Sequence, residues 1–71
     1  MSARKLAIGD DHWRYTIGHT DVVIWSPQRR RYHVSISKLL GIDIDSVYNL
    51  RHNRVLHVMP SDIKKYIEIL V

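Results

Sequence analysis

The feature that most constrains this chain is a series of three strand-like runs in its first half, separated by polar turns. The first, Trp13–His19, alternates large apolar and polar residues with a period of two, as a strand with one buried face does. The second, Val22–Trp25, is apolar throughout, which favours a central strand, and the third, Arg31–Ile36, alternates again. Pro27 lies in a turn sequence between the second and third runs. The pattern predicts an antiparallel meander with an apolar face that helices must cover.

The second half of the chain predicts those helices. Ser37–Leu40 has a helical pattern that ends at Gly41, and a second short helix follows from residue 45 to about residue 50 or 52. Ser61–Leu70 repeats apolar residues at i, i+3, i+4 and i+7, which is the spacing of an amphipathic helix, and Ser61 is its expected cap. We therefore expect two short middle helices and a longer C-terminal helix.

The remaining segments complete the predicted architecture. Val55–Val58 is a short apolar run suited to a fourth strand, whereas residues 1–11 show no clear period and are expected to form a loose N-terminal arm. Residues 1–71 would form a single domain of the α+β class. It would contain a small antiparallel sheet of three or four strands, two short middle helices and a C-terminal helix packed on the sheet.

The composition limits what such a domain can be. The 71 residues include no cysteine, which excludes disulfides and thiolate metal sites and makes a cytoplasmic location the expectation. No apolar run approaches the ~20 residues that cross a bilayer, and no small-molecule motif is evident. Because so small a chain buries little surface, a homodimer could complete its core, and Ile69 and Val71, which fall off the apolar stripe, would suit such a contact.

The charge pattern favours an anionic partner. Eleven Lys and Arg outnumber seven Asp and Glu, so the net charge is +4, and such basic surfaces most often meet nucleic acid. The densest cluster is Arg29, Arg30 and Arg31, in a hairpin flanked by Trp25 and Tyr32. Arginine pairs with phosphates and aromatic rings stack on bases, so this hairpin could bind a groove or a single strand. An ordinary solvated turn is the alternative.

A second candidate site is Ser35–Arg54, which reads as a short helix, a Gly-containing turn, a second helix and a basic exit. With Gly41 at the turn, a single register places apolar or small residues wherever a helix-turn-helix requires them. These residues are Ile36, Ser37, Leu40, Ile42, Val47 and Leu50.

Residues 35–68 resemble the small helix-turn-helix domain of excisionase and MerR-type regulators. The matching phrases are Leu40-Gly41-Ile42, Ser46-Val47-Tyr48 and Pro60-Ser61-Asp62-Ile63. The resemblance implies a non-enzymatic regulator or accessory factor that binds duplex DNA. On that resemblance the second helix would present Ser46, Tyr48, Asn49 and His52 to a major groove, with Asn49 suited to adenine. Arg51 and Arg54 would hold phosphates.

Other interpretations stay open. Asp43 and Asp45 would repel phosphates, which favours a mere helical connector over a DNA-reading motif. A protein-interaction module or inhibitor, for example of viral or mobile-element origin, could use the same basic face. A metal-independent RNase is a further alternative, because histidines with Tyr48, Arg51 and Arg54 supply the required acid, base and cation. The five histidines show no ligand spacing, so no metal or other cofactor is expected.

Overall fold

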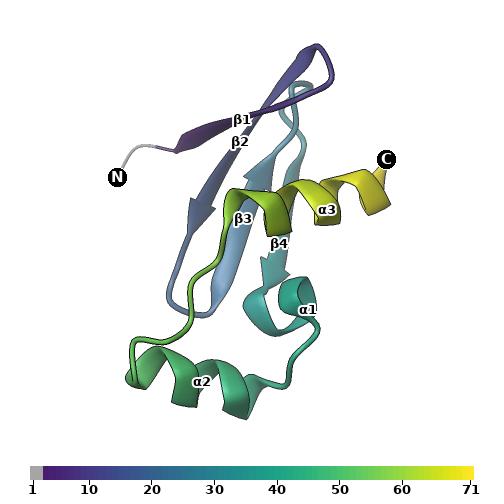
Figure 1. The fold of residues 1–71 in the computed structure, drawn as a ribbon. Helices are drawn as coiled ribbons and strands as arrows, with labels where there is room; N and C mark the ends of the chain where they lie inside the picture. Colours follow the sequence, from purple (N-terminus) through teal and green to yellow (C-terminus); the bar gives the residue numbers. More distant parts are fainter. Residues whose placement is uncertain (1–2) are drawn as a thin grey trace.

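The computed structural model describes residues 3–71, and there four strands precede three helices (Figure 1). The strands pair antiparallel in chain order and are β1 (Arg4–Ile8), β2 (Asp11–Ile17), β3 (Asp21–Trp25) and β4 (Arg31–Ser35). The helices are α1 (Ile36–Leu40), α2 (Ile44–His52) and α3 (Pro60–Leu70). The predicted α+β class is confirmed, including the C-terminal helix packed on the sheet. No helix within residues 3–71 has the length and apolar character to span a membrane.

The core lies between one face of the sheet and the helices. Every second residue of the strands points into it, as the period-two pattern requires. From the other side, α3 contributes Ile63 and Ile67, four residues apart on one helix face and both fully buried. The remaining buried apolar residues are Trp13, Tyr15, Val22, Ile24, Val34, Ile36 and Val47.

The expected loose arm is wrong for the described part of the N-terminus, and residues 1–2 lie outside the described residues. Arg4–Ile8 forms the edge strand β1, which pairs with β2 along its whole length. Leu6 and Ile8 point inward and pack against the core. The turn to β2 is tight because Gly9 adopts a positive φ of 62°, which favours glycine. Two inward apolar residues among charges are too few to mark a strand in sequence.

The expected fourth strand at Val55–Val58 is also wrong. The segment is an unpaired connection between α2 and α3, and Leu56 and Val58 pack against the core. At the start of α3, Met59 rather than Ser61 is the cap residue, because Pro60 already occupies the first helical position. The Asp62 carboxylate accepts a hydrogen bond from the Met59 backbone N–H at 3.0 Å.

Both middle helices end on a residue in the left-handed conformation. Gly41 has a φ of 71° after α1, and Arg54 has a φ of 57° after α2. At α2 the Val55 N–H donates to the Leu50 carbonyl at 2.8 Å, and the Arg54 N–H donates to the Arg51 carbonyl at 3.0 Å. These two bonds form a Schellman motif, in which glycine usually takes the place of Arg54.

Replacing the glycine at one helix end and introducing a glycine at the other should therefore shift the free energy of unfolding in opposite directions. Gly41→Ala should lower the free energy of unfolding by about 1 kcal/mol, because a Cβ there meets no atom within 4 Å and only the backbone conformation is penalised. Arg54→Gly should raise it by about 0.5 kcal/mol, since relief of the left-handed strain outweighs the added unfolded-state entropy. Urea unfolding followed by circular dichroism measures both. Equal losses from the two substitutions would contradict these helix ends.

Candidate nucleic-acid interface

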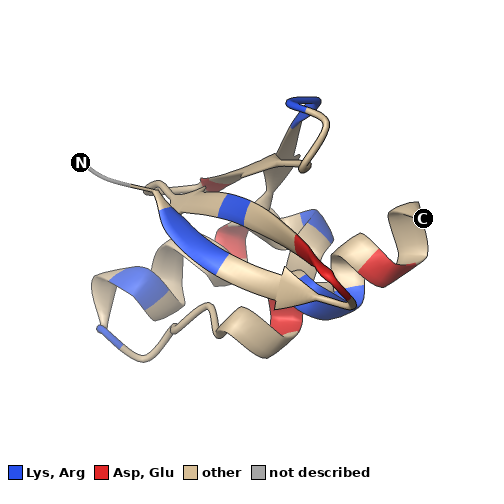
Figure 2. Cartoon of the chain, turned by 90° about the horizontal axis from the view of Figure 1, so that it is seen from above, with Lys and Arg blue, Asp and Glu red and all other residues tan. Residues whose placement is uncertain are grey.

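The outer face of the sheet carries none of the three helices of residues 3–71, because α1 and α3 lie on its other side and α2 lies beyond the end of the sheet, beside the β2–β3 turn (Figures 1 and 2). Strand register lines up four residues across this face. Lys5 lies opposite Arg14, Arg14 opposite Trp25, and Trp25 opposite Arg31. Directly opposed residues of antiparallel strands project to the same face with Cβ atoms about 5 Å apart. We call these four residues the basic row.

The basic row borders a hollow in the surface. The Arg14 guanidinium lies over the Trp25 ring, 5.5 Å from the ring centroid, in a cation–π contact. Around this pair a hollow of about 450 Å³ opens between β2 and the β3–β4 hairpin. Its lining residues are His12, Arg14, Trp25, Ser26, Pro27 and Arg29. The half-buried indole thus lies among cationic side chains at an accessible surface.

The β3–β4 hairpin holds its arginines at the edge of the hollow. The Arg29 N–H donates to the Ser26 carbonyl at 2.9 Å, and the Arg30 N–H donates to the Ser26 hydroxyl at 2.9 Å. Arg29 has a φ of 66°, which matches a three-residue loop of a type I turn followed by a left-handed residue. Arg29, Arg30 and Arg31 are all exposed, as predicted.

Among the residues that the structure describes, the cations of the basic row and of the β3–β4 hairpin have no carboxylate partner. Within residues 3–71, the one contact of a carboxylate with a basic side chain at ion-pairing distance joins Asp21 Oδ2 to His33 Nε2 at 3.2 Å, further along the sheet. In Figure 2, Lys and Arg mark β1, β2 and the tip of the β3–β4 hairpin, while the acidic residues of the β1–β2 hairpin lie at its turn. Positive charge on this face is therefore available to an external anion.

The predicted readout residues of α2 line a second, smaller hollow. Tyr48, Asn49 and His52 are exposed, and the His19 ring from the β2–β3 turn lies 6.3 Å from the Tyr48 ring, centroid to centroid, at an interplanar angle of 48°. With Arg51 these four residues enclose about 340 Å³. The structure thus brings together four of the predicted residues and adds His19, which the sequence did not single out.

The beginning of α2 is acidic and apolar. Asp43 caps the helix, accepting hydrogen bonds from the Ser46 N–H at 2.7 Å and the Ser46 hydroxyl at 3.0 Å. These bonds lower the pKa of the Asp43 carboxyl, so it carries its negative charge at neutral pH. Ser46 is engaged in the cap, Asp45 is exposed, and Ile44 is 42% exposed. This end of the helix is poorly suited to a phosphate backbone.

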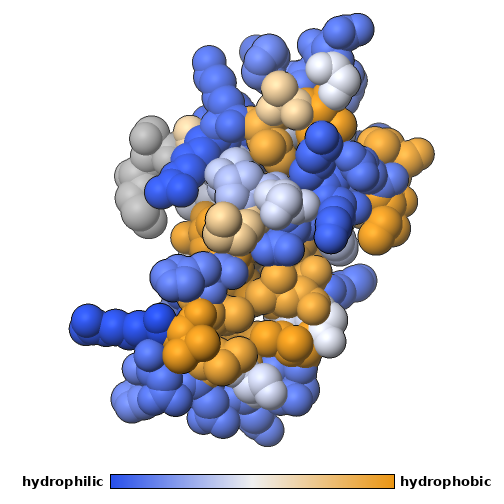
Figure 3. Space-filling view, in the orientation of Figure 1, coloured by the Kyte–Doolittle hydropathy of each residue, from blue (hydrophilic) through white to orange (hydrophobic). Residues whose placement is uncertain are grey.

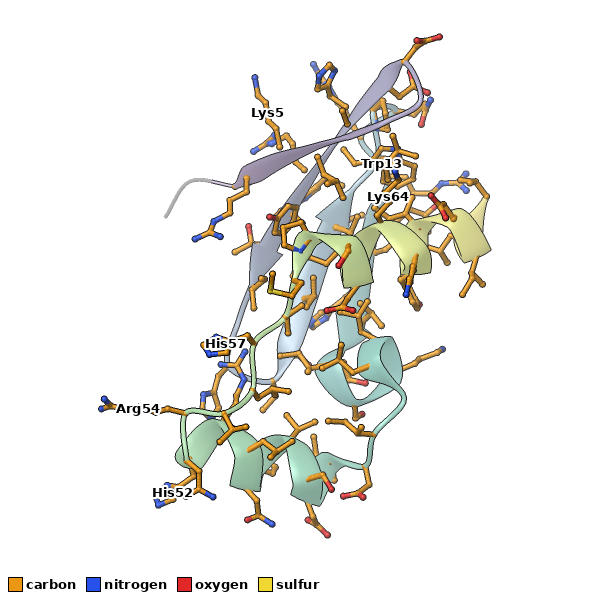
Figure 4. The ribbon with its side chains drawn as sticks, viewed as in Figure 1. Lys5, Trp13, His52, Arg54, His57 and Lys64 are labelled. Atoms are coloured by element: carbon orange, nitrogen blue, oxygen red, sulfur yellow. The ribbon has the colours of Figure 1, made fainter. Side chains whose placement is uncertain are left out.

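The two predicted phosphate-binding arginines, Arg51 in the last turn of α2 and Arg54 after its end, differ in their surroundings. Arg51 is half-buried, and its Nη2 donates to the Gly18 carbonyl at 3.0 Å, which ties α2 to the β2–β3 turn. Its Nε is buried without an acceptor among the described residues. Arg54 is exposed and points away from the body of the molecule in Figure 4. Arg51 is thus a structural link, and Arg54 is free to meet solvent or an anion.

Arg51→Ala should accordingly lower the free energy of unfolding by about 1–2 kcal/mol, because a charge-assisted hydrogen bond across the fold is lost. Arg54→Ala is the matched control and should change stability by less than about 0.5 kcal/mol, since alanine keeps the same backbone strain. Thermal unfolding of both variants provides the comparison. If Arg51→Ala left stability unchanged but weakened oligonucleotide binding, Arg51 would be the phosphate contact that the helix-turn-helix resemblance implies.

The two predicted basic sites lie at opposite ends of the sheet. The hairpin follows Trp25, whereas the β2–β3 turn that contacts α2 precedes Asp21, four residues or about 13 Å along β3. In Figure 4, Lys5 lies toward one end and His52 and Arg54 toward the other. Arg29, Arg30 and Arg31 instead share a surface with Lys5, Arg14 and His12, which the sequence left apart.

The helix side of the molecule has a different character. Figure 3 shows hydrophobic residues gathered over α1 and the connection from α2 to α3. Val55 and Met59 of this connection are 63% and 55% exposed. Apolar surface gives a polyanion no favourable contact, so the outer sheet face is the better candidate. Among residues 3–71, no three His, Asp or Glu side chains gather as metal ligands would.

Comparison with known proteins adds no relative to this picture. No protein-family model matches the sequence, and no curated protein and no solved structure is significantly similar to it. The geometry of residues 36–52, two helices joined by the three-residue turn Gly41–Asp43, is compatible with the predicted helix-turn-helix, although α1 has only five residues. The excisionase and MerR-type resemblance stays a prediction.

Proposed function

We propose that this protein is a small non-enzymatic nucleic-acid-binding protein whose main contact surface is the outer face of its sheet. The observation that carries the proposal is the basic row, where three cations and an indole line up on an uncovered face beside the exposed Arg29 and Arg30. Lys and Arg neutralise backbone phosphates, and this term dominates nonspecific affinity for nucleic acid.

The spacing of these cations suits a polyanion better than a single small anion. Lys5 and Arg31 lie on the two outermost strands, three strand spacings or about 14 Å apart. That distance corresponds to about four nucleotides at a rise of 3.4 Å. A chain of phosphates could therefore contact the row at several points at once, which a lone phosphate could not.

The exposed surface of α2 is the second candidate site for contacts with nucleic-acid bases. Tyr48, Asn49 and His52 stand free for base-edge contacts in duplex DNA, as the helix-turn-helix resemblance implies. Asp43 and Asp45 oppose that mode, because their carboxylates would lie near the phosphates. We therefore rank α2 below the sheet face. A regulatory role on DNA and a cytoplasmic location remain predictions that accompany this function.

Oligonucleotide binding followed by fluorescence anisotropy at rising salt tests the proposal. Five cations on the sheet face and hairpin predict a loss of affinity between 50 and 200 mM salt of about 100-fold for a single strand and about 500-fold for a duplex. Absence of binding at ~50 mM, or affinity that does not change with salt, would overturn the proposal. The basic face would then fit an acidic protein, as the interaction-module alternative holds.

The RNase alternative has one structural observation in its favour. The hollow beside α2 is lined by two imidazoles, from His19 and His52, together with Tyr48 and Arg51. These groups could supply the acid, base and cation of phosphodiester cleavage. Incubation of end-labelled RNA with the protein and a metal chelator decides the matter. A binding protein leaves the RNA intact, whereas fragments that disappear with His52→Ala would replace the proposed function with RNase activity.

A further inference from the structure

We infer that the sheet face takes single-stranded nucleic acid, with one base stacked on Trp25 in the hollow beside Arg14. The inference rests on the proposed nucleic-acid binding and narrows it to one class of ligand. It departs from the duplex DNA that the helix-turn-helix resemblance implies, and it follows from the shape, chemistry and width of the outer sheet face.

The two tryptophans of the chain have opposite surroundings. Trp13 points into the core and is 6% exposed, whereas Trp25 lies one strand away on the outer face and is only half-buried. The apolar surface of Trp25 is left accessible beside charged neighbours, within a hollow of about 450 Å³. That volume lies within the ~300–1,000 Å³ range of small-molecule sites and is sufficient for a nucleobase.

The surroundings of the ring suit the two parts of a nucleotide. The Arg14 guanidinium, 5.5 Å from the ring centroid, holds the indole in place and adds a planar cation on which a base can also stack. Pro27 supplies a further apolar wall, and Arg29 borders the same hollow. Arg31 lies directly opposite Trp25 on β4. A base on the indole would thus have cations on both sides for its flanking phosphates.

A duplex cannot use this surface in the same way. Its base faces are hidden in the stack, so only base edges in the grooves are open to a side chain. The major groove is about 12 Å wide and admits a helix or a two-stranded ribbon. The basic row spans four strands, about 14 Å from backbone to backbone before side chains are added. A flexible single strand can lie across such a face and offer an unstacked base to Trp25.

Anisotropy titrations of a labelled single-stranded oligonucleotide and of its duplex, both at ~50 mM salt, test the inference. The unmodified protein should bind the single strand at least about tenfold more tightly. Trp25→Ala should weaken single-strand binding about 5- to 150-fold, as expected for loss of one stacked base, while Trp25→Phe should retain most of the affinity. In a Trp13→Phe variant, the fluorescence of Trp25 alone should be quenched on binding.

The double substitution Lys64→Ala and Lys65→Ala, on the exposed face of α3, is the matched control and should keep the preference for the single strand. Circular dichroism confirms that each variant is folded. Duplex binding that equals or exceeds single-strand binding, together with an unchanged affinity of Trp25→Ala, would overturn the inference and leave nucleic-acid binding intact. Absence of binding to either oligonucleotide would instead overturn the proposed function on which the inference rests.

Discussion

Replacing Ile67 with alanine should leave the protein largely unfolded at 25 °C. Ile67 lies on α3 with no exposed surface, in the cluster that joins the helix to the sheet. Removing three buried carbon atoms from such a position costs about 2–5 kcal/mol through lost burial and the cavity left behind. A 71-residue domain without disulfides has a total stability of only a few kcal/mol. Urea unfolding monitored by circular dichroism measures the loss.

Ile69 on the same helix is the matched control. It is 81% exposed, so Ile69→Ala should change the free energy of unfolding by less than about 0.5 kcal/mol. A loss at Ile69 as large as that at Ile67, growing with protein concentration, would contradict this picture of α3. It would show that the outward face of α3 is buried in a second copy of the chain, as the expected homodimer requires.

The second large effect concerns binding. Converting the cations of the basic row together, by Lys5→Gln, Arg14→Gln and Arg31→Gln, should lower single-strand affinity about 100-fold at 0.1 M salt. The slope of log affinity against log salt should become less steep by about 2, because three phosphate contacts are lost. These side chains are exposed on the outer face, so the variant should fold normally. Anisotropy titrations at several salt concentrations give both quantities.

A second triple variant separates the row from net charge alone. Lys38→Gln, Lys64→Gln and Lys65→Gln remove the same charge from exposed positions on the helices. Affinity should fall only about threefold or less, since these cations lie away from the outer sheet face and are partly screened. Comparable losses in the two triple variants would mean that overall charge, rather than the arrangement of the row, governs binding.

Strands β2 and β4 could be predicted because each buries one face, which produces a visible period of two. Strand β3 could be predicted because its continuous apolar run lies between polar turn residues. Strand β1 could not, since Leu6 and Ile8 are its only inward apolar side chains and its partner is chosen by tertiary pairing. The apolar segment Val55–Val58 was wrongly predicted to be a strand because its local pattern is strand-like but its tertiary pairing is absent. It has strand-like composition, yet burial of Leu56 and Val58 is achieved without any hydrogen-bonded partner strand.

The candidate site likewise has one part that the sequence could predict and another that it could not. Arg29, Arg30 and Arg31 could be recognised because they are adjacent in the sequence. The basic row could not, because only strand register brings together Lys5 and Arg14. Register depends on turn geometry and on the shared core face, neither of which a local pattern specifies.

The contacts between α2 and the β2–β3 turn were also beyond prediction from the sequence. Arg51 looks like a phosphate ligand in the sequence, but the fold directs its guanidinium to the Gly18 carbonyl. His19, in turn, becomes a neighbour of Tyr48 only when the β2–β3 turn packs beside α2. In both cases the partner is more than 25 residues distant in the chain, so no local spacing reveals the contact.

The most direct test of the central claim, that the outer sheet face is the binding surface, is a titration of the isotope-labelled protein with a single-stranded oligonucleotide, followed by NMR. We expect the largest chemical-shift changes at the amides of Lys5, Arg14 and Arg31 and at the indole N–H of Trp25, with small changes along α3. Shifts confined to Tyr48, Asn49 and His52, with the sheet face unmoved, would contradict the claim and assign binding to α2.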